Sequence, residues 1–478
     1  MTTLFSSASH TAIELAEAQR VDNALYGDAK RRAKLGQYAT PLKIARLMAS
    51  LLDFSGLRPV RLLDPGMGAG VLTLACLEAF AQKRNDIENF EVTGYEIEKS
   101  AFRAVEKNVA KAIMDFGSLS HELKQVDFLK ALAPSQSFTH AIINPPYKKF
   151  ASTDERQTAL RNNGIHAVNL YVAFVWKALL ELQPEGQLVA IIPRSFANGT
   201  YYLPFRQYLK EHTSVKQVLL VDERTSVFAL DDVLQENVIL VLRKRNDIDQ
   251  VACQTKLTWL FGNDLSQNLN RSVTENQLWW DAKGACVLRL PKEHTAQDLP
   301  RYKLSDLKVR VSTGPVVDFR VDQFLIRATE PTAYPLLRPR HFAKGRCVWP
   351  NQIGKRAGGI LRTTQTEKFF WPVGYYVVVR RISSKEEPRR VVASLVTPKD
   401  FETDSICFEN HLNVFHHNRT GIGKELAVGL CNYLNGEITD RFLRSISGHT
   451  QVNAGDLRLL PYPSLVELQA FAKTLGCA

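Results

Sequence analysis

In the first half of the chain, short continuous apolar runs alternate with longer stretches whose apolar residues recur every three or four positions. The first run, Val60–Leu63, is followed by a glycine-rich loop and then by a helical period over Val71–Phe80. The pattern predicts further strands at Phe90–Tyr95, Lys124–Val126, Ala141–Ile143, Leu188–Ile192, Val215–Val221 and Asn237–Leu242, and further helices at Ala101–Phe116 and Tyr171–Leu182. Strands that alternate with helices in this way predict a parallel α/β sheet with helices on both faces.

The apolar period lapses into charged residues around 243–249, which predicts a domain boundary there. We expect an N-terminal helical extension over residues 1–30, an α/β domain over 31–246, and a second domain over 247–478. The second domain is richer in short β-like runs and turns, so we expect a mixed α+β fold. Three segments fit the length prior for 478 residues.

Composition is that of a globular protein, with 45% hydrophobic and 23% charged residues. No apolar run is long enough to span a bilayer, and Met1–His10 lacks the charged-then-apolar build of a signal peptide. The seven cysteines form no C-x-x-C pair, so neither a zinc site nor a disulfide framework is indicated. A reduced, cytoplasmic location is the natural expectation.

The most informative segment follows the run that ends at Ile143. Asn144-Pro145-Pro146-Tyr147, which we call the ledge, combines a side-chain amide, two rigid prolines and an aromatic ring. Such a set at the carboxyl end of a buried strand is suited to holding a planar amine.

Three acidic residues mark the ends of the strands before the ledge. Asp64 precedes the loop that contains Gly66, Gly68 and Gly70, Glu96 ends the second strand, and Asp127 ends the third. The carboxyl ends of adjacent parallel strands share one edge of a sheet, so we expect the three acids to surround one ligand. Glu96 is placed to accept from ribose hydroxyls. Asp127 is placed to accept from an adenine amino group, with Phe128 against the ring.

The motifs together resemble those of an S-adenosylmethionine-dependent DNA adenine-N6 methyltransferase. The order Gly36–Pro41, glycine loop, Glu96, Asp127, ledge is similar to the gamma class, which includes the Taq-type enzymes and modification enzymes of type II restriction–modification systems. That class has a Rossmann-like class I methyltransferase sheet, with the target-recognition domain after the catalytic domain. The resemblance covers nearly all of the chain after residue 30.

The resemblance implies S-adenosylmethionine as cofactor and double-stranded DNA as substrate. It places Gln37, Tyr38 and Thr40 with Asp64, Gly66, Gly68, Glu96, Asp127, Phe128 and Asn144 at the cofactor. The Asn144 amide oxygen and the Pro145 carbonyl would accept the amino hydrogens of a flipped adenine, which stabilises the charge that develops on nitrogen. Tyr147 would stack on the base.

Two local assignments have alternatives. The second stacking wall is expected at Phe228, with Phe196 as the competitor and a core position for Phe228 nearly as plausible. Thr40 before Pro41 also fits a helix N-cap, and Asn169 fits a cap better than a pocket residue.

A basic stretch lies in the second half of the chain, which has a net charge of +12 overall. Between Leu336 and Arg381 there are ten basic residues and one acidic residue, Glu367, with aromatic residues interleaved. This composition favours contact with DNA phosphates over a merely solvated face. The expected contacts are Arg338, Arg340, Lys344, Arg346, Lys355 and Arg356.

Two other functions stay open. A ledge of this kind also serves protein-glutamine methylation, and an RNA methyltransferase is related chemistry, but such enzymes carry little chain after the catalytic domain. A non-catalytic DNA-binding modification subunit would not need an intact ledge. Three histidines, His411, His416 and His417, lack carboxylate or cysteine partners at metal-ligand spacing, so no metal is expected. By resemblance, we expect a monomer that is paired functionally with a separate restriction endonuclease.

Overall fold

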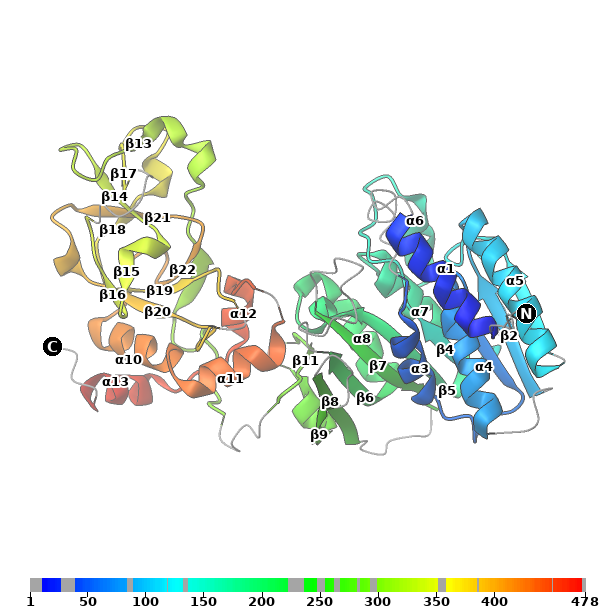
Figure 1. Ribbon diagram of the computed structural model, residues 1–478. Helices are drawn as coiled ribbons and strands as arrows, with labels where there is room; N and C mark the ends of the chain where they lie inside the picture. The colour runs from blue at the N-terminus through cyan, green and yellow to red at the C-terminus, as the bar shows by residue number, and fades with distance from the viewer. Residues whose placement is uncertain are drawn as a thin grey trace, which may run out of the picture. The chain divides into compact units, whose positions relative to one another are not determined.

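The computed structural model describes residues 11–26, 39–83, 89–117, 119–131, 136–221, 236–246, 254–261, 267–281, 284–292, 299–350, 358–384, 387–448 and 450–474. The chain divides into two compact units, Met1–Trp280 and Asp281–Ala478 (Figure 1). Within the described ranges, no helix combines the length and apolar character needed to cross a bilayer.

A nine-stranded sheet forms the centre of the first unit, in the order β3-β2-β1-β4-β5-β7-β6-β8-β9. The neighbours from β3 through to β5 are parallel, and β7 lies antiparallel between β5 and β6. The strands are β1 Val60–Asp64, β2 Phe90–Tyr95, β3 Ser120–Lys124, β4 Phe138–Ile143, β5 Leu182–Pro193, β6 Thr213–Val221, β7 Asn237–Lys244, β8 Gln254–Phe261 and β9 Gln267–Thr274, with the short β10 Trp279–Trp280 outside the sheet. The expected α/β sheet, parallel from β3 through to β5, is confirmed.

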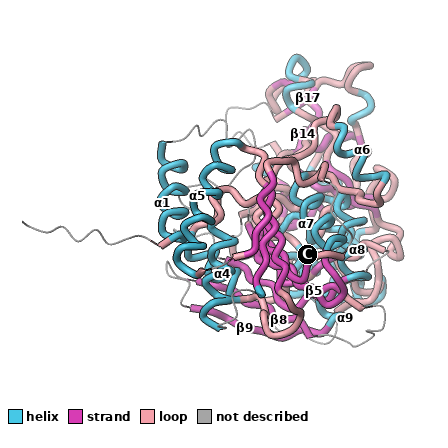
Figure 2. The backbone as a smooth tube through the Cα atoms, turned by 90° about the vertical axis from the view of Figure 1, so that its right-hand side faces the viewer, coloured by secondary structure: helices cyan, strands magenta, loops and turns pink. Residues whose placement is uncertain are grey.

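Helices cover both faces of this sheet (Figure 2). One face carries α1 Ala12–Tyr26, α3 Leu42–Ser50, α4 Val71–Lys83 and α5 Lys99–Phe116, whose buried side chains share one hydrophobic core. The other face carries α7 Leu170–Glu181 and α8 Leu203–His212. Two shorter helices are α6 Glu155–Asn162 and α9 Glu275–Leu278. The helices predicted over Val71–Phe80, Ala101–Phe116 and Tyr171–Leu182 are present with small shifts at their ends. The third strand lies at Ser120–Lys124 and therefore precedes the expected Lys124–Val126.

The first unit is larger than the expected 31–246 segment at both ends. Helix α1 belongs to its core, because Ala12, Ile13 and Ala16 are buried with side chains of α4 and α5. At the other end, β8 pairs in parallel with β6 and β9 pairs with β8, so the sheet continues past residue 246. The charged residues around 246 therefore belong to a connection within the first unit. The boundary between the two units falls after Trp280.

Two sheets and a set of helices form the second unit, as the mixed α+β expectation requires. The six-stranded sheet has the order β12-β22-β19-β20-β16-β15, and the five-stranded sheet has the order β13-β17-β14-β21-β18. The strands are β11 Val287–Leu288, β12 Arg310–Thr313, β13 Leu325–Ile326, β14 Tyr334–Leu337, β15 Phe342–Ala343, β16 Arg346–Cys347, β17 Gly359–Ile360, β18 Trp371–Pro372, β19 Tyr376–Arg380, β20 Ala393–Val396, β21 Ser405–Phe408 and β22 Leu412–His416. The helices are α10 Lys424–Leu434, α11 Glu437–Ile446, α12 Ala454–Leu459 and α13 Leu465–Thr474.

Candidate active site

The register of the central strands brings the motif residues to one edge of the sheet. Asp64 pairs with Gly94 across β1 and β2, so Glu96 lies two residues beyond this level. Leu63 pairs with Ala141 across β1 and β4, so Asn144 also lies just beyond the end of β1. Adjacent strands are roughly 5 Å apart. The glycine loop, Glu96 and Asn144 therefore meet at the carboxyl ends of three neighbouring strands, the usual ligand position in open α/β sheets.

Backbone geometry accounts for the glycines of the loop. Gly68 and Gly70 have φ values of +55° and +88°, which favour glycine. Gly94, in the adjacent strand β2, is required for a different reason, which is space for the Met67 side chain. A Cβ at Gly94 would lie 1.8 Å from the Met67 sulfur, so the Met67 side chain lies directly over the backbone of β2.

Glu96 holds the glycine loop with its carboxylate. Its Oε2 accepts a hydrogen bond from the Gly68 N–H at 2.9 Å, and Oε1 accepts from the Glu98 N–H at 2.7 Å. The residue is 7% exposed, and burial raises the pKa of its carboxyl group. Each carboxylate oxygen has a second lone-pair site, so these bonds are compatible with accepting from ribose hydroxyls.

Asp64 lies deeper than its position at a strand end suggested. It is fully buried, its Oδ2 accepts from the Thr73 hydroxyl at 2.8 Å, and burial raises its pKa to about 7. This contact joins the end of β1 to helix α4 and thereby supports the glycine loop. Direct contact between Asp64 and a cofactor stays a prediction.

The Asp127 carboxylate is partly exposed and could contact a ligand, whereas the neighbouring Phe128 ring is buried. Asp127 accepts from the Leu129 N–H at 2.9 Å and from Arg156 at 3.1 Å, and its side chain is 13% exposed. Phe128 is 1% exposed and packs between Tyr95 and Phe174, with ring centroids 5.2 and 5.4 Å away. The structure thus places Phe128 in the core, which contradicts the expected packing of its ring against adenine.

Two residues that sequence reasoning missed offer apolar surface instead. Ile97, directly after Glu96, is 60% exposed, and Val126, directly before Asp127, is 46% exposed. Exposed aliphatic side chains next to the two acids suit the faces of a purine ring. The detectable signal was an apolar residue adjacent to each strand-end acid.

The ledge is anchored to the segment before α3. The Asn144 Nδ2 donates to the Thr40 Oγ1 at 2.9 Å, although 104 residues separate them. We expected that Thr40 could be the N-cap of α3, but the structure contradicts this. Pro41 occupies that position in an extended conformation, and its carbonyl accepts from the Ala45 N–H. The Thr40 hydroxyl instead orients the Asn144 amide, while Gln37 and Tyr38 lie outside the described residues.

Tyr147 is fixed by its hydroxyl. It donates to the Ile191 carbonyl at 3.1 Å, and its ring lies edge-on to Tyr171 with centroids 6.3 Å apart. Of the two candidates for a second wall, Phe196 is fully buried and packs edge-on to Phe205, which excludes it as an accessible wall. Phe228 lies outside the described residues, so its role stays a prediction.

Asn169 acts as the simpler interpretation predicted. Its Oδ1 accepts from the Val172 N–H at 3.1 Å and caps helix α7. Its Nδ2 donates to the Tyr202 hydroxyl at 3.1 Å, and the Tyr202 ring stacks on Tyr171. The cap therefore also supports the aromatic residues behind Tyr147.

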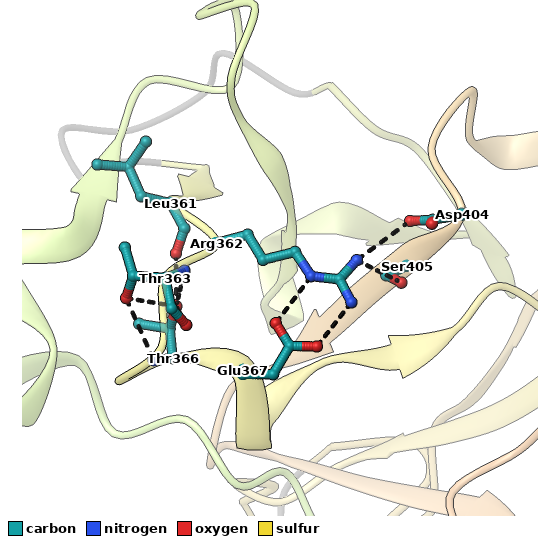
Figure 3. A network of polar contacts seen from close by, with 7 residues as sticks. All are labelled: Leu361, Arg362, Thr363, Thr366, Glu367, Asp404 and Ser405. Atoms are coloured by element: carbon teal, nitrogen blue, oxygen red, sulfur yellow. Dashed lines mark hydrogen bonds and ion pairs between the residues drawn. The ribbon is translucent and has the colours of Figure 1, made fainter.

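In the second unit, several of the basic residues between Leu336 and Arg381 are used within the fold. Arg338 is 4% exposed and forms an ion pair with Asp318 at 2.9 Å, so the expected contact with phosphate is contradicted at this position. Figure 3 shows Arg362 with both ends of its guanidinium engaged. Its Nε and Nη2 donate to Glu367 at 2.9 and 2.7 Å, and Nη1 lies 3.5 Å from Asp404.

A β-hairpin carries two of the expected DNA contacts on the surface. Lys344 and Gly345, with φ values of +49° and +78°, form the two-residue turn between β15 and β16. Lys344 and Arg346 are exposed. Arg340 is half-buried beside His341, with 3.4 Å between Nε and the imidazole Nε2. Lys355 and Arg356 lie outside the described residues.

The residues at the strand ends fit S-adenosylmethionine. Glu96 and Asp127 supply acceptors, Ile97 and Val126 supply apolar surface, and the glycine loop leaves open space at Gly68, where an added Cβ would meet no atom within 4 Å. The carboxylates also match the positive charge of a sulfonium ligand. Within the described ranges no group of three or more His, Cys, Asp or Glu is arranged to hold a metal ion.

Comparisons with known proteins agree with this geometry. A family model described as Eco57I restriction-modification methylase matches residues 37–228. The chain is 37% identical over 452 residues to the type II methyltransferase M.BsuBI of Bacillus subtilis, covering 91% of this chain and 89% of that protein. It is 32% identical over 465 residues to M.PstI of Providencia stuartii, covering 93% and 90%. Among solved structures, the DrdV–DNA complex has a similar fold, with a TM-score of 0.51 and 13% identity over 97% of this chain and 59% of that one.

Proposed function

The chain belongs to the type II methyltransferases of restriction–modification systems, and we propose that it transfers a methyl group from S-adenosylmethionine to N6 of a flipped-out adenine in a defined double-stranded DNA site. The observation that carries this proposal is the Asn144 amide, which Thr40 anchors at the end of β4 beside the glycine loop and Glu96. A methyl donor and a planar amine would meet at that point.

The cofactor supplies an electrophilic methyl group on a sulfonium. The chain's own contribution is to hold and polarise the amine. The Thr40 hydroxyl accepts from Nδ2, so the Asn144 Oδ1, the other terminal atom of the amide, points away from Thr40. We assign Oδ1, together with the Pro145 carbonyl, to the two amino hydrogens of adenine. This localises the nitrogen lone pair as the new bond forms, and it requires an acceptor and no strong base.

Tyr147 would stack on the extruded base. Its hydroxyl bond to Ile191 and its edge contact with Tyr171 hold the ring in place before the base arrives, which lowers the entropic cost of binding. Extrusion is needed because the adenine amino group cannot be reached inside the duplex stack. Phe228 remains our candidate for the opposite wall.

Recognition of the site falls to the second unit in this proposal. We retain Lys344 and Arg346 as phosphate contacts because both are exposed on one hairpin, and we retain Arg340, Lys355 and Arg356 as candidates. The relatives' type II class supports pairing with a separate endonuclease, from which methylation would protect the site. We further propose that the enzyme acts as a monomer in the bacterial cytoplasm, where its DNA is found.

The test is transfer of labelled methyl groups from S-adenosylmethionine to unmethylated double-stranded DNA, with RNA and protein as competing acceptors. We expect label in DNA alone, recovered as N6-methyladenine, and a large loss of this label with Asn144→Ala. Label in RNA or protein alone would overturn the choice of substrate. Binding of S-adenosylhomocysteine without transfer to any acceptor would favour a non-catalytic subunit.

A further inference from the structure

Between the ledge and helix α7 the chain makes a closed excursion over residues 148–170. The Leu170 N–H donates to the Lys148 carbonyl at 2.8 Å, and Lys149 and Asn169 form an isolated β-bridge. The excursion therefore leaves and returns at one point, immediately after Tyr147. Helix α6 lies within it, and Asp154 caps that helix by accepting from the Arg156 N–H.

Arg156 joins this excursion to the end of β3. Its Nε and Nη2 donate to the two oxygens of Asp154 at 2.9 and 2.6 Å, which fixes the guanidinium plane. Its Nη1 then donates to Asp127 at 3.1 Å. The guanidinium also lies 5.8 Å from the Phe150 ring centroid, and 25% of the side chain is exposed. The contact with Asp127 thus comes from an arginine that is already oriented.

For Asp127, the consequence is a carboxylate held from two sides. Oδ1 accepts from the Leu129 N–H at 2.9 Å, and Oδ2 accepts from Arg156. The plane of the carboxylate is therefore set before a ligand binds. A carboxylate offers about four lone-pair sites, so a further donor such as an adenine amino group can still be accepted.

We propose that Arg156 is a positioning residue for the adenine end of the cofactor, and that it couples occupancy of that subsite to the order of residues 148–170. This rests on the proposed function, because Asp127 is assigned to the cofactor adenine there. Arg156 acts through Asp127 and does not touch the ligand. Since the excursion starts directly after the ledge, the bound cofactor would stabilise the chain next to the reacting base.

Two ligands that differ only at the purine 6-position separate positioning from general stability. S-adenosylhomocysteine presents an amino group to Asp127, whereas S-inosylhomocysteine presents a carbonyl. We expect Arg156→Ala to weaken binding of S-adenosylhomocysteine about fivefold to tenfold, as measured by calorimetry, and to leave S-inosylhomocysteine within about twofold. Arg161→Ala, at an exposed arginine in the last turn of the same helix, should change neither.

Arg156→Lys serves if the alanine variant does not fold. It keeps the charge but loses the fork that reaches two carboxylates, so we expect the same selective loss at smaller size. Equal losses for both ligands, or none for either, would overturn the positioning role. Failure of the wild-type chain to bind S-adenosylhomocysteine would count against the proposed function instead.

Hydrogen exchange tests the coupling separately. In the wild-type protein, saturating S-adenosylhomocysteine should slow amide exchange over Glu155–Asn162. In Arg156→Ala, the same saturation should leave exchange in this helix unchanged. Equal slowing in both proteins would overturn the coupling.

Discussion

Charged residues serve different ends in the two units. In the first unit, Glu96 and Asp127 lie just beyond the carboxyl ends of the neighbouring strands β2 and β3, so the sheet topology brings them to one edge of the sheet. In the second unit, Arg338 and Arg362 are ion-paired with acidic side chains of their own fold. A charged residue at a position set by topology is informative about function, whereas a density of charge along the chain is not, because the fold itself consumes part of it.

The largest test of this contrast is at the ledge. Asn144→Ala should lower methyl transfer by about a hundredfold to a thousandfold, the usual loss when one preorganised polar contact to the transition state is removed. Binding of S-adenosylhomocysteine should stay within a few-fold, since the cofactor is held mainly by other residues. Single-turnover transfer and calorimetry measure the two effects, and unchanged turnover would refute the role of Asn144.

Arg338 tests the second unit. Arg338→Met removes the ion pair between Arg338 and Asp318, so we expect the free energy of unfolding to fall by about 2–3 kcal/mol. This loss lies at or below the usual range for breaking a buried ion pair, because the Asp318 side chain is 21% exposed. At temperatures where the variant is folded, the slope of DNA affinity against salt should not change. A flatter slope would return Arg338 to the DNA-binding surface.

Gly94 offers the corresponding structural test in the first unit. A Cβ would lie 1.8 Å from the Met67 sulfur, so Gly94→Ala should destabilise the protein by about 1–3 kcal/mol through overpacking. In the double variant Gly94→Ala/Met67→Ala, the loss of unfolding free energy should be smaller than the sum of the losses in the two single variants. Strict additivity in denaturant unfolding would show that the two residues are not in contact.

Hairpin residues give the smallest expected effect. Changing Lys344 and Arg346 together to alanine should reduce the slope of log affinity against log salt by about 2, which corresponds to the loss of two phosphate contacts. The matched control is Lys424→Ala, at an exposed lysine that begins helix α10. If the double variant keeps the wild-type slope, this hairpin does not contact the phosphate backbone.

Much of the first unit could be predicted because its strands are apolar runs and its loop needs glycine. The positions of Glu96 and Asn144 followed from strand order. Side-chain direction could not be predicted: Phe128 points into the core between Tyr95 and Phe174, and Ile97 is exposed. Nor could the Thr40–Asn144 hydrogen bond, which joins residues 104 apart and replaces the expected cap.

Prediction failed in other ways where local pattern and tertiary structure diverge. The run of charge near residue 246 looked like a domain boundary, yet β8 continues the sheet beside β6. Arg338 looked like a surface cation, yet Asp318, 20 residues earlier in the chain, neutralises it in a buried position. In both cases the structure depends on a partner that lies far away along the chain: β6 for β8, and Asp318 for Arg338. A short window of sequence therefore could not have predicted either contact.

The most direct test of the account is to map modified adenines in DNA from cells that express the wild-type chain or Asn144→Ala. We expect N6-methyladenine at one short recurring sequence with the wild type and far less of it at that sequence with the variant. Absence of N6-methyladenine with the wild type, or equal modification with both proteins, would contradict it.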